Sequence, residues 1–200
     1  MIERYNILER VVHWTSALSY LYVLATGLAF YSPHLYWIAM VLGGGATSRY
    51  WHPWIGMLFL ATVLWMWRAW RADMRITEVD RRWGQCMQHY VRNEDERLPP
   101  IDRFNLGQKY FFWLMLYAGI VLLASGVVLW FPELLSPALR FTAILAHVTA
   151  ALLTIGGFII HVYMGIAVVR GGFHAMVRGE VTAAWARMHH RLWYQRMTGE

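Results

Sequence analysis

The chain has 200 residues, of which 58% are hydrophobic, 16% are aromatic and 15% are charged, and its mean hydropathy is +0.34. An average soluble domain carries about 25% charged residues, so this composition indicates a small membrane protein that forms a single domain, residues 1–200. The single cysteine, Cys86, excludes a disulfide framework, a haem attached through a CxxCH motif and a cysteine-held iron–sulfur cluster.

Two apolar stretches in the first half are each long enough to cross a hydrocarbon core of about 30 Å. The first, about 11–31, follows the charged segment MIERYNILER, and no small-residue cleavage site follows it. We therefore expect this stretch to be retained as a span rather than removed as a signal peptide. The second, about 51–70, opens with SRYWHPW, in which Pro53 suits the first turn of a helix.

The second half contains two further spans. Residues 68–109 are rich in charge and predict a solvated linker. The third span, about 110–131, has no histidine, but its small residues Gly119, Ser125 and Gly126 allow close approach of a helix or a flat cofactor. The fourth, about 141–170, is almost wholly apolar. Apolar residues at helical spacing between arginines in the tail, 171–200, predict an amphipathic surface helix.

The distribution of positive charge predicts the orientation. Of the 18 Lys and Arg residues, only Arg49 and Arg140 lie in the two loops expected on one side of the membrane. By the positive-inside rule, both termini are then cytoplasmic. The predicted fold is an all-α bundle of four transmembrane helices.

Two histidines in the fourth span need an explanation, because an ionisable group in hydrocarbon is costly and usually functional. His147 and His161 are fourteen residues apart, which places them about 21 Å apart along one helix and about 40° apart around it. The direction of each span then assigns partners by depth. His13 shares the cytoplasmic level with His161, and His52 shares the outer level with His147.

Two pairs of facing imidazoles suit two b-type haems, because trans imidazoles are ligands of six-coordinate haem iron. Zinc or copper would require another number of ligands or thiolates. Arg10 and Arg49 each lie three residues before a predicted ligand, one turn closer to water. We expect them to face haem propionates, although a lipid-facing arginine would occupy the same position.

These residues resemble the membrane-bound cytochrome b (gamma) subunit of respiratory formate dehydrogenases over nearly the whole chain. The segments that carry the resemblance are ERVVHW at 9–14, SRYWHPWIG at 48–56, RFNLGQKYFFW at 103–113, SGVVLW at 125–130, IIHVYMG at 159–165 and the tail from Gly179.

The resemblance implies a bacterial inner-membrane protein with two haem b groups. It implies that a molybdenum or tungsten subunit oxidises formate and that an iron–sulfur subunit passes the electrons to this chain. The chain would then carry them to a quinone, menaquinone or ubiquinone, at Asn105, Gly107 and Gln108 with His161 adjacent. The resemblance implies lipid and these subunits as partners, allows a higher oligomer of the complex, and gives no reason to expect nucleic acid.

Three alternatives remain at this point. The electron donor could be a nickel–iron hydrogenase or another molybdoenzyme, because formate never meets this subunit. A membrane anchor without haem, whose histidines relay protons or bind metal, would be colourless. In the cytochrome b of a quinol-oxidising complex, two helices usually each carry a ligand pair, whereas here only the fourth span does.

Overall fold

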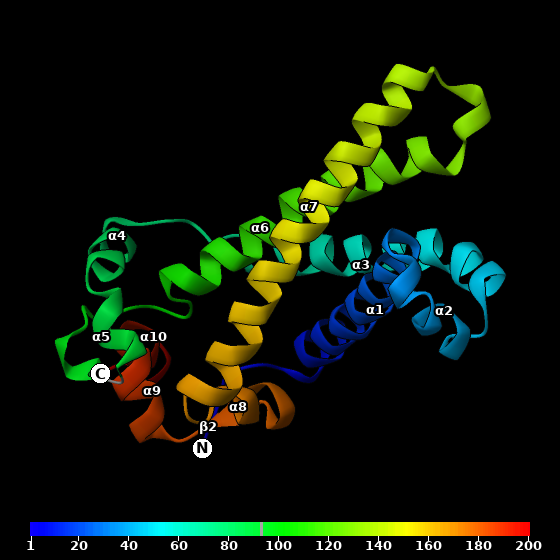
Figure 1. Cartoon of the computed structure of the whole chain (residues 1–200). Coiled ribbons are helices and arrows are strands. Elements are labelled where there is room, and N and C mark those ends of the chain that lie inside the picture. Colours follow the sequence, from blue (N-terminus) through cyan, green and yellow to red (C-terminus); the bar gives the residue numbers. More distant parts are fainter. Residues whose placement is uncertain (93) are drawn as a thin grey trace. The chain divides into compact units, whose positions relative to one another are not determined.

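The computed structural model describes residues 1–92 and 94–200, which are mostly helical (Figure 1). The chain divides into two compact units. The first unit consists of Met1–Arg10, Arg68–Trp113 and Gly157–Glu200, and the second of Val11–Trp67 and Leu114–Gly156.

Four long helices account for most of the chain: α1 (Ile7–Tyr31), α3 (Gly45–Trp70), α6 (Leu106–Trp130) and α7 (Pro137–Tyr163). They correspond to the four predicted spans, and each begins four to six residues earlier than predicted. In the described part of the chain, Leu106–Trp130 and Pro137–Val168 are long and apolar enough to cross a membrane by length and composition.

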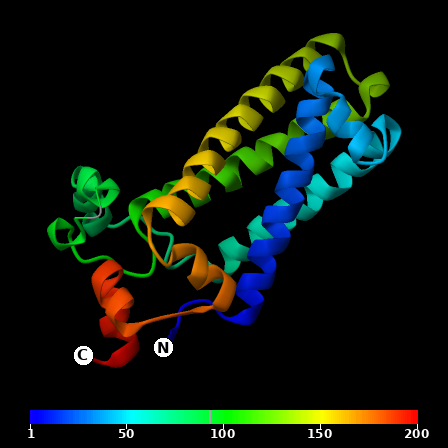
Figure 2. The same ribbon diagram turned by 60° about the horizontal axis from the view of Figure 1, so that its bottom comes forward.

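Short elements connect the long helices. Between α1 and α3 lie η1 (Pro33–Leu35) and α2 (Trp37–Val41), and Figure 2 shows the hairpin in which η3 (Pro132–Leu134) joins α6 to α7. α3 starts after Gly43 and Gly44, whose φ angles of 94° and 96° end the preceding turn. Pro53 therefore lies inside α3, and its predicted place in the first turn is wrong.

The predicted tail helix is wrong, because the tail consists of three short helices and a strand. These are α8 (Gly172–Arg178), β2 (Glu180–Val181), α9 (Ala183–His189) and α10 (Arg191–Thr198). α7 ends in a π turn, η4 (Met164–Val168), and the glycines that flank α8, Gly171 and Gly179, have φ angles of 88° and 87°. β2 pairs antiparallel with β1 (Ile2–Glu3), in the register Ile2 with Val181. The apolar residues of the tail have helical spacing, but the glycines that flank α8 interrupt the helix.

The charged linker has more structure than its composition predicted. It forms α4 (Glu78–Gln85), α5 (Met87–Val91) and η2 (Asp95–Arg97). Trp83, Ile101 and Leu106 form a small buried core, against which other apolar residues of the linker pack. These apolar residues are scattered among charged ones, so the average composition of the stretch does not reveal them.

Candidate functional site

The second unit brings together the two histidines that were predicted to share the outer level. His52 on α3 and His147 on α7 face each other with ring centroids 6.4 Å apart and ring planes inclined by 47°. Both side chains are partly buried. Two imidazoles from different helices therefore lie close together in an apolar bundle.

A hydroxyl from α1 determines which nitrogen of His52 is free. His52 Nδ1 lies 2.7 Å from Thr26 Oγ1. The hydroxyl proton of Thr26 is directed to the carbonyls of Tyr22, at 2.9 Å, and Val23, at 3.2 Å. Because a hydroxyl has only one proton, its oxygen accepts the proton of His52 Nδ1. Nε2 of His52 then keeps its lone pair for a metal.

His147 is held in the same way from α6. Its Nδ1 lies 3.0 Å from Ser125 Oγ, whose proton goes to the Val121 carbonyl at 2.6 Å. With the hydroxyl proton on this carbonyl, Ser125 Oγ accepts from Nδ1, and Nε2 of His147 is the unprotonated nitrogen in that tautomer. Both histidines present the same atom as a ligand, and both depend on a neighbouring helix to do so.

Glycines leave space beside both rings. A Cβ atom at Gly27 would lie 3.7 Å from His52 Cε1, and one at Gly126 would lie 3.5 Å from His147 Cε1. These are ordinary contact distances, so an added Cβ would already touch each ring. The sequence pattern identified Ser125 and Gly126 as small residues that allow close approach, but it did not predict the contact between the Ser125 hydroxyl and His147.

The spacing of the two rings fits a metal between them. A bond of about 2 Å from each Nε2 to the metal, added to the radii of the two rings, requires centroids about 6 Å apart, and the observed separation is 6.4 Å. Among the described residues, no group of three or more His, Cys, Asp or Glu side chains could hold a metal ion. Two histidines suit a metal whose other ligands belong to a cofactor, as the four nitrogens of a porphyrin would.

The other predicted pair is divided between the units. His13, on α1 in the second unit, contacts Trp14 edge-on, with centroids 5.4 Å apart. His161, on α7 in the first unit, stacks flat on Phe111, with centroids 4.3 Å apart and planes inclined by 5°. The pairing of His13 with His161 stays a prediction.

The residues that the resemblance assigned to quinone begin α6. The backbone N–H of Asn105 donates to Gln108 Oε1 at 3.0 Å, and the N–H of Gln108 donates to Asn105 Oδ1 at 2.9 Å. These reciprocal bonds form a helix cap. They use only the amide oxygens, so both side-chain NH₂ groups keep donors. A Cβ atom at Gly107 would lie 3.4 Å from Asn105 Oδ1.

A cavity of about 400 Å³ opens beside the start of α6. Its lining comes from α4, α5 and α6: Arg81, Gly84, Gln85, Met87, Leu106, Gly107 and Tyr110. Of the residues that the resemblance assigned to quinone, Gly107 also lines this cavity. The α4 and α5 residues were missed because they belong to a stretch that was predicted to be solvated.

The two arginines predicted to face propionates differ in environment. Arg10 donates from Nη2 to the Val177 carbonyl of α8, so its guanidinium is partly committed to the backbone. Arg49 is exposed in the first turns of α3. Next to it, Ser48 is fully buried, and its hydroxyl has no hydrogen-bond partner in the part of the chain that the structure describes.

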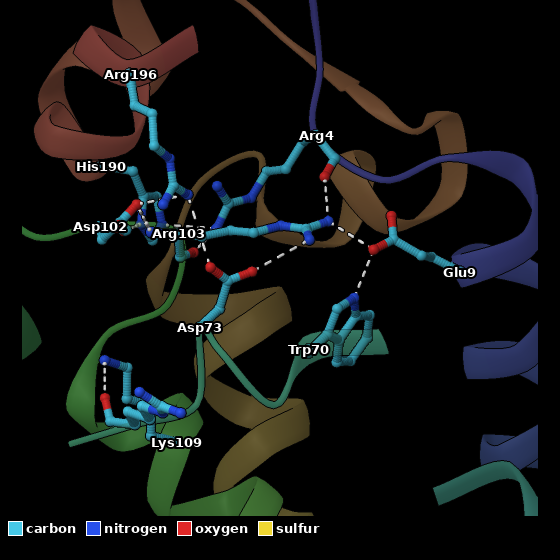
Figure 3. Close-up of polar contacts among 10 residues, drawn as sticks. Arg4, Glu9, Trp70, Asp73, Asp102, Arg103, Lys109, His190 and Arg196 are labelled. Carbon is cyan, nitrogen blue, oxygen red and sulfur yellow. Dashed lines mark hydrogen bonds and ion pairs between the residues drawn. The ribbon is translucent and has the colours of Figure 1, made fainter. Parts of the chain in front are cut away.

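A network of buried and partly buried charges in the first unit was not predicted (Figure 3). Arg103 Nη2 donates to Glu9 Oε1 at 2.8 Å and to the Arg4 carbonyl at 2.9 Å. Trp70 Nε1 donates to the same Glu9 oxygen, and Arg103 forms an ion pair with Asp73 at 3.5 Å. Glu9 and Arg103 lie within the motifs ERVVHW and RFNLGQ, and these motifs are the sequence feature that could have pointed to the network.

His190 attaches the tail to this network. Its Nδ1 lies 2.7 Å from the Asp102 carbonyl and accordingly donates to it, while Nε2 accepts from Arg4 Nη2 at 2.9 Å. Burial, and then the charge of Arg4, place the pKa of His190 well below its usual value. His190 is therefore neutral in the folded protein.

The comparisons with known proteins identify the family of the chain. The family described as prokaryotic cytochrome b561 matches residues 4–179. The formate dehydrogenase cytochrome b556(fdo) subunit of Escherichia coli K12 is 33% identical over 97% of this chain and 92% of its own length. The cytochrome b556 subunit from Haemophilus influenzae is 32% identical over 97% of this chain and 82% of its own.

The nitrate-inducible cytochrome b556(Fdn) subunit of Escherichia coli K12 is 27% identical over 98% of this chain and 91% of its own length. These matches confirm the resemblance drawn from the motifs. The chain therefore belongs to the prokaryotic cytochrome b561 family, and the cytochrome b556 subunits of formate dehydrogenase are among its relatives.

Proposed function

We propose that this chain is the membrane subunit of a formate dehydrogenase, and that it carries electrons between two haem b groups to a quinone. In this proposal α1, α3, α6 and α7 cross the bacterial inner membrane with both termini in the cytoplasm. An iron–sulfur subunit delivers the electrons, and a molybdenum or tungsten subunit oxidises formate. The full-length similarity to formate dehydrogenase subunits supports this assignment.

The spacing of His52 and His147 carries the proposal. Their ring centroids are 6.4 Å apart, which leaves room for a metal bonded to one nitrogen of each ring, and both Nδ1 atoms lie beside hydroxyls, so that both Nε2 lone pairs are available. A proton relay or a simple anchor would need neither feature. A haem bound there supplies a one-electron redox centre.

Each pair of histidines has a role set by depth. His52 and His147 hold the outer haem, and His13 and His161 hold the inner one. α7 supplies one ligand to each pair, so that one helix fixes the distance between the two sites. Arg49 on the outer side and Arg10 on the inner side stand where propionates would need a cation.

The quinone site is proposed at the start of α6. The NH₂ groups of Asn105 and Gln108 can donate to a quinone carbonyl because their oxygens are already held by the backbone. Gly107 keeps the backbone accessible, and His161 lies at the same cytoplasmic level. Quinone reduction would take its protons from the cytoplasm and its electrons from the outer side. This separation of charge would generate a membrane potential. Turnover in proteoliposomes without a potential-sensitive dye response would contradict this coupling.

His161→Ala, compared with His147→Ala in the purified complex, tests the proposal. We expect the wild-type chain to show two b-type haems and each variant one. His161→Ala should leave the outer haem reducible by formate but stop quinone reduction, whereas His147→Ala should stop electron entry. His34→Ala, which replaces an exposed histidine after α1, is the matched control and should keep both haems. Two haems in either ligand variant would refute the ligand assignment.

A further inference from the structure

We propose that Thr26 and Ser125 are positioning residues for the outer haem, which orient its two histidines and lower the tendency of its iron to accept an electron. The inference rests on the proposed function, because it requires a haem between His52 and His147. It adds two residues that have no metal-binding side chain of their own and that lie on helices other than those of the ligands.

The arrangement of the bundle supports this role. His52 on α3 is held by Thr26 on α1, and His147 on α7 is held by Ser125 on α6. All four long helices therefore contribute to this site, two through a ligand and two through a hydroxyl. α6 has no histidine, so its proposed contribution to the outer iron is the hydrogen bond that Ser125 accepts from His147.

Burial makes the two hydroxyls the determinants of ring orientation. Thr26 is 0% exposed and Ser125 is 7% exposed, so bulk water does not compete for Nδ1. Each hydroxyl proton is already given to a carbonyl of its own helix. With its proton on that carbonyl, each hydroxyl accepts from Nδ1, which keeps the proton on Nδ1 and directs Nε2 away from the helix that carries the hydroxyl.

The same hydrogen bonds affect the iron electronically. An imidazole that donates its N–H becomes a stronger base at the other nitrogen and favours the more positive, ferric iron. One electron enters at iron during reduction, and the Nδ1 proton stays on the histidine throughout. Removing the acceptor should weaken the ligand and make the ferrous state easier to reach.

Thr26→Val removes the hydroxyl and keeps the shape of the side chain, and Ser125→Ala does the same at the other ring. Thr62→Val is the matched control. The Thr62 hydroxyl on α3 makes the same kind of bond, 2.6 Å to the Phe59 carbonyl, and no bond between Thr62 and a histidine is found in the described structure. Thr26→Ser restores the acceptor and should recover wild-type behaviour.

The measurement is an optical redox titration of the two haems in the intact complex, with low-temperature electron paramagnetic resonance of the ferric forms. At a fixed potential, we expect the ferrous-to-ferric ratio of one haem to rise about fivefold in Thr26→Val or Ser125→Ala, the effect of losing one hydrogen bond. The other haem should titrate unchanged, and the resonance of the affected haem should shift because its ring is no longer fixed.

Titration curves and resonances identical to wild type in both hydroxyl variants would overturn the inference. So would an equal shift in Thr62→Val. If the Thr26→Val chain failed to assemble into the complex, the titration and resonance of Ser125→Ala would test the inference by the same criteria. A wild-type chain without haem would instead refute the proposed function itself, so the two failures are distinguishable.

Discussion

The hydroxyl of Tyr20 on α1 donates a hydrogen bond of 3.2 Å to Thr154 Oγ1 on α7. Both side chains are almost completely buried, with 4% and 1% of their surface exposed. Thr154 lies seven residues from His147 and seven from His161, about 10 Å along the helix from each. A polar link thus connects α1 and α7 midway between the two predicted ligand levels of α7.

We predict that this bond stabilises the bundle modestly. Hydrogen bonds between membrane helices contribute about 0.6 kcal/mol on average, so Tyr20→Phe should lower the free energy of unfolding in detergent by about that amount. A double-mutant cycle with Thr154→Val isolates the pair. Tyr31→Phe, at an exposed tyrosine, should have no effect. Fully additive effects of Tyr20→Phe and Thr154→Val would show that the two hydroxyls are not coupled.

The sequence predicted the helices and the convergence of His52 with His147 because both follow from long-range regularities. The prediction took the depth of each histidine from helical periodicity and the direction of each span from the bias in positive charge. Thr26 and Ser125 could not be predicted in the same way. Hydroxyls are common in helices, and nothing in the spacing of one helix shows which hydroxyl will meet a ring on another.

The parts that were predicted wrongly depend on local backbone conformation. Gly179 interrupts an apolar pattern that remains helical on both sides of it, which is why the tail was predicted as one helix. The linker was misjudged for a different reason: its buried charges, such as Asp80 and Lys109, are paired. Charged residues in a sequence do not show whether they have a partner.

The pair of Lys109 and Asp80 should therefore be sensitive to single substitutions. Lys109 Nζ lies 2.6 Å from Asp80 Oδ2, and the two side chains are only 4% and 3% exposed. Lys109→Met would leave a buried carboxylate without its cation, which typically costs about 3–5 kcal/mol. We expect a large loss of thermal stability, measured by circular dichroism in detergent. The double variant Lys109→Met/Asp80→Asn should recover part of it. Arg82→Met, at an exposed ion pair, is the control.

Stability should fall as the pH falls below the ordinary pKa of histidine because of His190. Burial and the charges of Arg4 and His189 lower its pKa in the folded state, opposed only by the Asp102 carbonyl. Below a pH of about 6.5 the unfolded chain takes up a proton that the folded chain resists, so the free energy of unfolding decreases. Between pH 7 and pH 5 the loss from this one group is up to about 2 kcal/mol.

Urea unfolding at a series of pH values checks this prediction. His190→Gln should be less stable at pH 7 but should show a shallower decline towards pH 5. His174→Gln, at an exposed histidine of the same unit, should keep the wild-type slope. An unchanged slope in His190→Gln would mean that other groups cause the acid sensitivity.

Gly179 should tolerate no side chain, for two separate reasons. Its φ angle of 87° is unfavourable for any residue with a Cβ. In addition, a Cβ at this position would lie 2.6 Å from the carbonyl oxygen of Tyr5. The Gly179 carbonyl accepts from the N–H groups of Arg4 and Tyr5 at 2.8 Å and 3.0 Å.

Gly199 separates the two effects, because it has a φ angle of 74° but no atom within 4 Å of an added Cβ. Gly199→Ala should cost about 1 kcal/mol, the backbone penalty alone. Gly179→Ala should cost more than twice as much and should detach the first strand, which limited proteolysis of the N-terminus would reveal. Equal losses in the two variants would mean that the contact with Tyr5 relaxes freely.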